Sequence, residues 1–177
     1  MRRITLISTG GTIEKTYDEH SGSLMNRSSV VQEMLGLMRI EDTVVNTLQL
    51  MQKDSLELTD QDRDRIVQAV ELVAGPETNP GAHEAVVILH GTDTLCQTGD
   101  LLQERIGGWV KVPVVLTGAM RPFEMKRSDA LQNLTESIFA TGVLDPGVWL
   151  VAHGRALAFP GLVKDRERGT FRAVNLG

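Results

Sequence analysis

The chain has 177 residues, of which 41% are hydrophobic and 23% are charged, and its formal net charge is −5. This length and composition suit one soluble globular unit with a single well-buried core, so a second full domain is not expected. The acidic balance argues against non-specific binding to nucleic acid, which needs clustered lysine and arginine side chains to displace counterions.

Five compact apolar runs predict β-strands. In chain order they cover residues 4–8, 44–51, 85–89, 112–117 and 148–152. Their continuous Val, Ile and Leu content is typical of strands that are covered on both faces.

Amphipathic segments between these strands predict helices. In residues 59–74, Thr59 is a candidate N-cap with Asp62 three positions later, and Gly75 with Pro76 ends the helix. Further helices are predicted over residues 28–38, 94–106 and 128–141, the last capped by Ser128, and a surface loop over residues 75–84. Strands that alternate with helices imply a mainly parallel sheet with helices on both faces. We therefore predict a three-layer α/β/α fold, flavodoxin-like or Rossmann-like, over residues 1–177.

No segment has the features of a targeting or membrane sequence. The apolar stretch after Arg3 ends at Ile7, which is too short for the core of a signal peptide. No apolar segment approaches the roughly 20 residues needed to span a bilayer. The single cysteine, Cys96, lies inside a predicted helix and fits a buried thiol in a reducing compartment. We expect a cytoplasmic protein with no membrane partner.

The first strand runs into a turn rich in glycine and threonine. Thr9 and Thr12 flank the paired glycines Gly10 and Gly11. Paired glycines allow positive φ angles and let a ligand approach the backbone closely. A plain tight turn is one interpretation, and a reactive hydroxyl is another. A phosphate cradle is disfavoured, since neither the dinucleotide glycine spacing nor a nucleotide-loop Gly-Lys-Ser/Thr ending is present.

A second hydroxyl-rich segment follows the third predicted strand. Residues 90–94 read His-Gly-Thr-Asp-Thr, and Thr92 or Asp93 could simply cap the next helix. At a strand end, His90 fits a hydrogen-bonded core histidine better than a catalyst. No metal site is expected, because the four histidines show no ligand spacing; they are His20, His83, His90 and His153.

The carboxyl ends of parallel strands meet at one edge of a sheet, where ligands bind in open α/β folds. Residues 117–122, Thr-Gly-Ala-Met-Arg-Pro, follow the fourth strand, and Lys164 lies in the stretch after the fifth. Hydroxyls, an acid and one lysine thus collect at this edge. A threonine hydroxyl becomes a good nucleophile only when a base removes its proton, and a lysine in a suitable environment can be that base. The edge therefore favours acyl transfer over hydride or phosphoryl transfer.

These segments resemble the signatures of the bacterial-type L-asparaginase family. Residues 9–13 are similar to its first signature, residues 90–94 to its second, and residues 118–122 to a third characteristic loop. The similarity runs from about Ile4 to the C-terminus. It implies hydrolysis of a side-chain amide, that of L-asparagine, to a carboxylate and ammonia. It also implies that no cofactor is needed and that the protein is a homodimer or homotetramer.

The resemblance assigns roles to individual residues. Thr12 would be the nucleophile, with Thr92, Asp93 and Lys164 as a second hydroxyl–acid–base set in which Thr92 activates water or assists Thr12. Backbone N–H groups at Thr12 and Thr92 would stabilise the oxyanion. Tyr17 would be the mobile-loop tyrosine beside the nucleophile. The implied substrate contacts are Gly11, Gln52, Lys53, Asp54, Gly91 and Ala119.

Some features depart from the family pattern. Members commonly have Ser-Gln-Asp after the second strand to bind the substrate's α-carboxylate and α-amino group, where this chain has Gln52, Lys53 and Asp54. Lys53 adds a positive charge that could hold a carboxylate, and Asp54 can still pair with an ammonium. Glu14 stands where small residues are usual. Relatives continue into a smaller C-terminal domain, so residues 1–177 are expected to form a single N-terminal-type domain without it.

Two other functions stay open at this stage. A glutaminase, or an amidotransferase-type ammonia donor, would use the same threonines on L-glutamine. A non-catalytic domain would bind an amino acid without activating water. We also expect self-association to cover a site that lacks the small domain, with residues 155–172 near the interface. Within that segment, residues 159–163 are an apolar run without obvious helical or strand context.

Overall fold

The computed structural model describes residues 1–75 and 85–174 of the chain. These residues contain a six-stranded sheet of order β4-β1-β5-β6-β7-β8. Its strands are β1 (Arg2–Gly10), β4 (Thr43–Lys53), β5 (Ala85–Leu89), β6 (Pro113–Thr117), β7 (Gly147–Ala152) and β8 (Arg155–Ala158). Neighbouring strands pair in parallel except β7 and β8, which are antiparallel. The five predicted strands are confirmed, and β8 is an edge strand that the apolar pattern did not predict.

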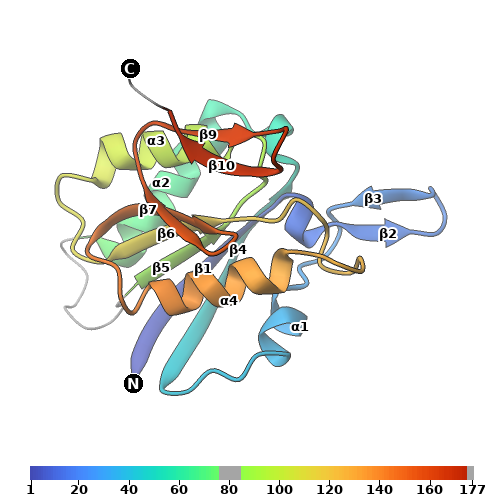
Figure 1. The fold of residues 1–177 in the computed structure, drawn as a ribbon, viewed down its shortest axis with the longest axis horizontal. Coiled ribbons are helices and arrows are strands. Elements are labelled where there is room, and N and C mark those ends of the chain that lie inside the picture. Colours follow the sequence, from blue (N-terminus) through green and yellow to red (C-terminus); the bar gives the residue numbers. More distant parts are fainter. Residues whose placement is uncertain (76–84, 175–177) are drawn as a thin grey trace.

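Helices cover both faces of this sheet (Figure 1). The pair α2 (Asp60–Ala74) and α3 (Leu95–Ile106) packs on one face, and α1 (Val31–Gly36) and α4 (Ala130–Ala140) pack on the other. The predicted three-layer α/β/α fold is therefore confirmed. The predicted surface loop at residues 75–84 lies outside the described residues, apart from Gly75.

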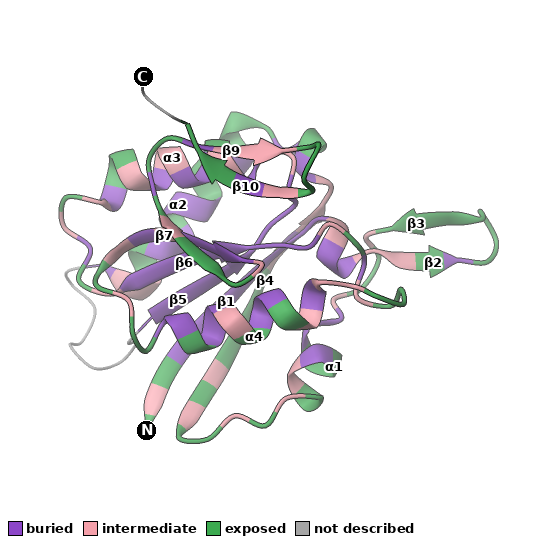
Figure 2. Cartoon of the chain, viewed as in Figure 1, coloured by how far each residue is buried: buried purple, intermediate pink, exposed green. Residues whose placement is uncertain are grey.

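The central strand β5 shows how the sequence builds two cores. Its side chains alternate, so that Val86 and Ile88 join the core beneath α2 and α3, whereas Val87 and Leu89 join the core beneath α1 and α4. All four side chains are fully buried, and β5 and β6 are buried along their whole length (Figure 2). A strand buried on both faces needs an uninterrupted apolar run, which is why this pattern was readable from the sequence.

The helices begin close to the predicted caps. At the start of α2, Thr59 Oγ1 accepts the Asp62 N–H at 3.2 Å, and the Asp62 carboxylate accepts the Thr59 N–H at 3.0 Å. This capping box confirms the predicted helix start. Helix α4 begins two residues after the predicted start, with Ser128 Oγ accepting the Ala130 N–H. The predicted helix over residues 28–38 is shorter, as α1.

The structure gives residues 159–163 a context that the sequence pattern did not show. Phe159 and Leu162 are only 5% and 4% exposed and belong to the core beneath α2 and α3. The strand β9 (Leu162–Asp165) begins there and pairs antiparallel with β10 (Thr170–Ala173). Gly99 on α3 leaves room for the Phe159 ring, because a Cβ at Gly99 would lie 2.0 Å from it. The run owes its context to partners distant in sequence, which local pattern does not reveal.

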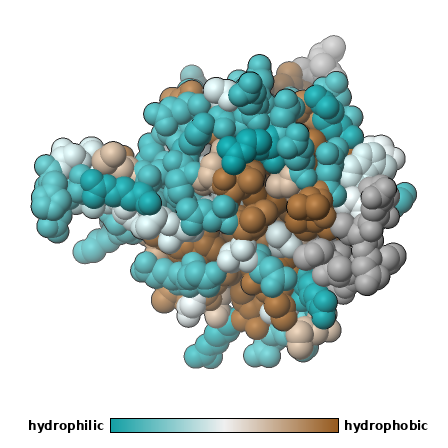
Figure 3. Space-filling model, turned by 180° about the vertical axis from the view of Figure 1, so that it is seen from behind, coloured by the Kyte–Doolittle hydropathy of each residue, from teal (hydrophilic) through white to brown (hydrophobic). Residues whose placement is uncertain are grey.

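Smaller elements complete the described chain. The hairpin of β2 (Thr16–Asp18) and β3 (Ser23–Met25) extends away from the body of the molecule (Figure 1). Seen from behind, hydrophobic residues gather in the middle of the surface among hydrophilic ones (Figure 3). Cys96 on α3 is only partly buried, and burial raises the pKa of its thiol to about 12. No helix in the described ranges is long and apolar enough to cross a membrane.

Candidate active site

The turns that follow β1 and β5 touch each other through glycine backbone. The two strands are neighbours in the sheet, with Ser8 opposite Leu89. Gly11 has a φ of 78°, and a Cβ there would lie 2.4 Å from the Gly91 Cα. Neither a side chain nor a different backbone geometry fits this contact. The approach brings residues about 80 positions apart in sequence to one edge of the sheet, as predicted.

Thr12 begins a short 3-10 turn, η1 (Thr12–Glu14), immediately after this contact. The residue is partly exposed. Its hydroxyl has no hydrogen-bond partner within residues 1–75 and 85–174, whereas its carbonyl accepts the Lys15 N–H at 3.2 Å. The hydroxyl is thus held by the backbone and is free to meet a ligand.

Thr92, Asp93 and Lys164 form one bonded set. Lys164 Nζ donates to Thr92 Oγ1 at 2.7 Å and to Asp93 Oδ1 at 2.9 Å. Lys164 comes from β9, so the C-terminal ribbon supplies the third member of the set. Arg166 also donates to Asp93 Oδ1, at 2.8 Å. The structure therefore brings together three residues that the sequence placed in one catalytic set.

Two opposing effects act on the Asp93 carboxyl. Its partial burial raises the pKa, while the hydrogen bond and charge of Lys164, together with Arg166, lower it. The cations prevail, so the pKa of Asp93 lies below its ordinary value. Asp93 is therefore a carboxylate at neutral pH, and it holds Lys164 against the Thr92 hydroxyl. Such an arrangement can relay a proton between the Thr92 hydroxyl and the Lys164 side chain.

The residues at the carboxyl end of β4 lie beside these loops but have other partners. Asp54 is ion-paired with Lys15, which follows η1 directly. The Lys15 hydrogen bond holds the pKa of Asp54 below its ordinary value, with help from the Lys164 charge. Lys53 Nζ donates to both carboxylate oxygens of Asp62, at 2.9 and 2.8 Å. The Lys53 ammonium, which the sequence suggested as a partner for a substrate carboxylate, is therefore paired with Asp62 in the first turn of α2.

Gln52 and Glu14 meet below the turn that carries Thr12. The Glu14 side chain is fully buried, and its carboxylate accepts hydrogen bonds from Ser8 Oγ, Ser29 Oγ and the Gly10 N–H, with Gln52 Nε2 at 3.4 Å. The Gln52 Oε1 atom is buried and has no hydrogen-bond partner among the described residues. Glu14 thus ties β1, β4 and the segment before α1 to the turn that carries Thr12. The sequence marked Glu14 as unusual but did not suggest this role.

Tyr17 is not brought to the other site residues in this structure. It lies on β2, in the projecting hairpin, and 57% of it is exposed. Its hydroxyl lies 3.9 Å from the position that a Cβ at Gly22 would take, on the same hairpin. Its N–H donates to Glu124 Oε1 at 2.6 Å.

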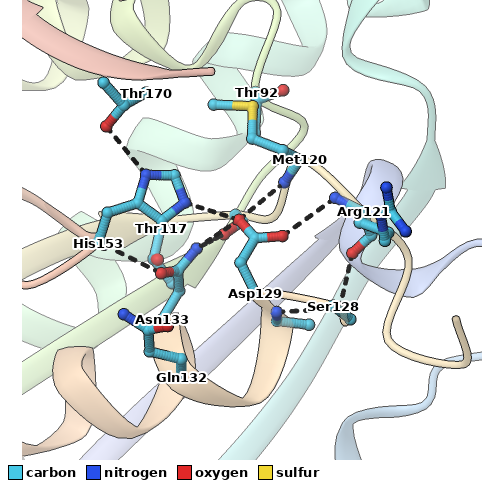
Figure 4. Close-up of polar contacts among 12 residues, drawn as sticks. Thr92, Thr117, Met120, Arg121, Ser128, Asp129, Gln132, Asn133, His153 and Thr170 are labelled. Atoms are coloured by element: carbon cyan, nitrogen blue, oxygen red, sulfur yellow. Dashed lines mark hydrogen bonds and ion pairs between the residues drawn. The ribbon is translucent and has the colours of Figure 1, made fainter. Parts of the chain in front are cut away.

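A polar network fixes the loop after β6 (Figure 4). Asp129 accepts the N–H groups of Met120 and Arg121 at 3.0 and 3.1 Å, and its Oδ2 lies 2.8 Å from His153 Nε2. His153 Nδ1 bonds with Thr170 Oγ1 at 2.9 Å. Burial raises the Asp129 pKa, but the N–H of Met120 and the His153 ring outweigh that effect and lower it.

The same network links the loop to the Thr92 turn. Asn133 Nδ2 donates to the Gly118 carbonyl at 2.8 Å. A Cβ at Gly118 would lie 2.2 Å from the His90 carbonyl oxygen, so the two backbones are in close contact, and Ala119 next to it is buried. Sequence reasoning missed Asp129, Asn133 and His153. Asp129 and Asn133 lie at the start of α4, and His153 lies in the turn after β7. Their polar character was the signal in the sequence, but only the fold shows that they lie together.

His90 is a hydrogen-bonded core histidine, as the sequence favoured. It is fully buried, its Nδ1–H donates to the Gly91 carbonyl at 2.8 Å, and Nε2 lies 2.8 Å from Thr98 Oγ1. Burial lowers its pKa to about 4, so the ring is neutral at neutral pH. The ring shapes the backbone beside Thr92. Among the described residues, no group of three or more His, Cys, Asp or Glu side chains could hold a metal ion.

Comparison with known proteins decides the family. The model of the asparaginase N-terminal domain matches residues 3–176. The chain belongs to the asparaginase family. It is 29% identical over 175 residues to the L-asparaginase of Thermococcus kodakarensis, covering 98% of this chain and 51% of that one. It is also 28% identical over 160 residues to a subunit of the glutamyl-tRNA(Gln) amidotransferase of Methanococcus maripaludis, covering 87% of this chain and 35% of the relative.

Solved structures agree with this assignment. The thermostable L-asparaginase from Thermococcus kodakarensis superimposes with a TM-score of 0.85 at 26% identity, covering 99% of this chain and 52% of that one. The probable cytoplasmic L-asparaginase from Campylobacter jejuni, at 24% identity and a TM-score of 0.79, shares the fold, with 98% of this chain and 52% of that one covered. The chain spans about half the length of these L-asparaginases.

Proposed function

We propose that this chain is an amidohydrolase that converts L-asparagine to L-aspartate and ammonia, with Thr12 as the nucleophile. One observation carries the proposal. The Thr12 hydroxyl, which has no hydrogen-bond partner within the described residues, lies at the edge of the sheet where Lys164 is hydrogen-bonded to Thr92 and Asp93. Family membership supports the reaction class.

In the proposed reaction, Thr12 Oγ attacks the side-chain amide carbon. The hydroxyl proton passes to a base and on to the leaving nitrogen, so ammonia departs and an ester on Thr12 remains. Water then attacks the ester, and its proton passes through the Thr92 hydroxyl to Lys164 and on to the departing Thr12 Oγ, which releases free Thr12 and the product acid, ionised as its carboxylate. The N–H groups of Thr12 and Thr92 are proposed to stabilise the oxyanion in both steps. Tyr17 would contribute only if its hairpin folded toward Thr12.

Ammonia release from L-asparagine tests the assignment. Thr12→Ala should lower kcat by at least ~10²-fold, because the covalent step is lost. Thr135→Ala is a matched control, since Thr135 lies on the exposed side of α4 and bonds only to the Leu131 carbonyl. Turnover that survives Thr12→Ala unchanged would reject Thr12 as the nucleophile.

The second candidate keeps the chemistry and changes the substrate. The likeness to subunits of glutamyl-tRNA(Gln) amidotransferases favours it. L-Glutamine has one more methylene than L-asparagine, a difference that typically changes discrimination by only ~1–3 kcal/mol. Comparison of kcat/KM for the two amino acids decides between the candidates. Aspartate binding without ammonia release from either would instead identify a non-catalytic amino-acid-binding domain.

We also propose that the chain self-associates as a homodimer or homotetramer. A groove of about 260 Å³ lies between α4 and β8 and is lined by Phe139, Val143, Arg155 and Ala156 among others. Phe139 and Val143 are 69% and 65% exposed, and exposed apolar side chains gathered in a groove are typical of interaction surfaces. Arg155 and Ala156 fall in the segment predicted to lie near an interface. Light scattering over a dilution series tests this, and an active strict monomer would refute it.

A further inference from the structure

The ion pair between Lys15 and Asp54 lies beside the proposed nucleophile. Lys15 is the residue after η1, and its N–H is bonded to the Thr12 carbonyl. Its Nζ is bonded to Asp54 Oδ2, and the side chains are only 23% and 27% exposed. The second carboxylate oxygen of Asp54 accepts the Leu56 N–H at 3.0 Å. Both oxygens of Asp54 are therefore occupied by groups of this chain.

The other carboxylate at this edge is also occupied. Asp93 Oδ1 accepts from both Lys164 and Arg166. The charge of Lys164 reaches Asp54 as well, since it contributes to the lowered pKa of that residue. Lys15, Lys164 and Arg166 are therefore the cations bonded to the carboxylates of Asp54 and Asp93.

This balance treats the two charged groups of an amino acid differently. A ligand carboxylate can share the Lys15 ammonium with Asp54. A ligand ammonium must displace Lys15 from Asp54 while it remains close to Lys15 and Lys164. Coulomb repulsion between ammonium groups a few ångströms apart is strong in a partly buried site. Free L-asparagine carries both groups, whereas its analogue without the amino group carries only the carboxylate.

We propose that Lys15 is a specificity-determining residue that occupies the place at Asp54 where a substrate's α-ammonium would bind. The favoured substrates are β-amides of dicarboxylates whose α-amino group is absent or acylated, such as succinamate and N-acetyl-L-asparagine. Free L-asparagine is bound at the cost of breaking the Lys15–Asp54 pair. This inference rests on the proposed amidohydrolase function, but it concerns binding and is testable without turnover.

The decisive experiment is calorimetry with a matched pair of product analogues. Succinate and L-aspartate differ only by the amino group. The unmodified chain should bind succinate at least about tenfold more tightly than L-aspartate, on the scale expected for a partly buried charge interaction. Lys15→Met should reverse the order, because Asp54 is then free to accept the aspartate ammonium and a cation for succinate is lost.

Two further variants make the result specific. Asp54→Asn in the Lys15→Met background should abolish the gain for L-aspartate, since the acceptor is removed. Lys111→Met is the control for loss of a lysine, because Lys111 is exposed and has no ion pair within the described residues. Lys15→Arg, which keeps the charge, should retain the preference of the unmodified chain. A melting temperature for each variant separates a binding change from unfolding.

The outcomes distinguish the two proposals. L-Aspartate bound as tightly as succinate by the unmodified chain would overturn the role of Lys15, and so would an unchanged ratio in Lys15→Met. Ammonia release from succinamate and L-asparagine adds the catalytic readout, with kcat/KM expected to follow the same order. If neither amide is hydrolysed but the binding order reverses, the amidohydrolase function fails and the Lys15 inference stands.

Discussion

The two halves of the candidate site are held in different ways. Thr92 is fixed by a side-chain bond, because Lys164 holds its hydroxyl and cannot move without breaking its ion pair with Asp93. The Thr12 hydroxyl has no such bond within the described residues, and Thr12 is placed by backbone, through the glycine contact at Gly11 and the short turn that follows. A hydroxyl that must form and break a covalent bond needs a free lone pair. A hydroxyl that only relays a proton can stay bonded throughout.

The largest effect is expected in the half of the site formed by Thr92, Asp93 and Lys164. Lys164→Met should lower kcat for amide hydrolysis by about 10²–10⁴-fold, because general base catalysis contributes on that scale. Single-turnover measurement of ammonia release and of acyl-enzyme hydrolysis shows which step is slowed. Lys111→Met serves as the control and should keep full activity. If Lys164→Met retained wild-type kcat, the bonded set would have no catalytic part.

The second prediction concerns Thr12 and tests the buried Glu14 side chain beneath its turn. Glu14→Ala should lower the free energy of unfolding by about 2–4 kcal/mol, because Ser8, Ser29 and the Gly10 N–H would lose their acceptor inside the protein. Glu14→Gln should cost less, since its amide oxygen can still accept the Gly10 N–H and the Ser29 hydroxyl can turn to accept from its NH2 group. Urea unfolding measures both.

Glu33→Ala, at an exposed position of α1, is the matched control and should change stability little. If Glu14→Ala were as mild as Glu33→Ala, the turn beneath Thr12 would not depend on the Glu14 carboxylate.

A smaller effect is expected in the pH dependence of stability, through Asp93. The pKa of Asp93 is lowered in the folded chain, so its ionised form stabilises the fold at pH above about 4, and that contribution is lost as pH falls further. The difference in melting temperature between the unmodified chain and Asp93→Asn should therefore shrink between pH 7 and pH 3. For the exposed Asp145→Asn, the difference should stay flat. A difference for Asp93→Asn that grew toward acid pH would contradict the assigned direction.

The smallest effect is expected at Tyr17. Tyr17→Phe should change the free energy of unfolding by no more than ~0.5 kcal/mol, because the hydroxyl lies on an exposed hairpin. Its effect on kcat is the sharper measurement. A loss of tenfold or more would show that the hairpin closes over Thr12 during the reaction, so that both halves gain side-chain contacts when substrate is bound.

The sequence allowed the sheet and its helices to be predicted because their signals are local. Val86–Leu89 is apolar at every position, and Thr59 with Asp62 carries its capping pattern within four residues. The ribbon of β9 and β10 has no such signal, since its strands are four residues each and mix charge with apolar groups. Its place depends on the burial of Phe159 against α3.

The candidate site shows the same division. Thr12 and Thr92 stand beside glycines that mark their turns, so they could be proposed directly. The position of Lys164 after the fifth strand placed it at the same edge, but its set with Thr92 and Asp93 came from the family resemblance, because 72 residues separate it from Thr92. The pairs Lys15–Asp54 and Lys53–Asp62 could not be foreseen, since either lysine could reach either carboxylate until the strand register was known.

The sequence distance between Thr92 and Lys164 also orders events during synthesis. A nascent chain that has emerged through β6 already holds Thr12, Thr92 and four neighbouring strands of the sheet, but not Lys164. The Lys164–Thr92 bond spans 72 residues and can form only after β9 has been synthesised. Formation of this bond is therefore a sign that the ribbon of β9 and β10 has docked.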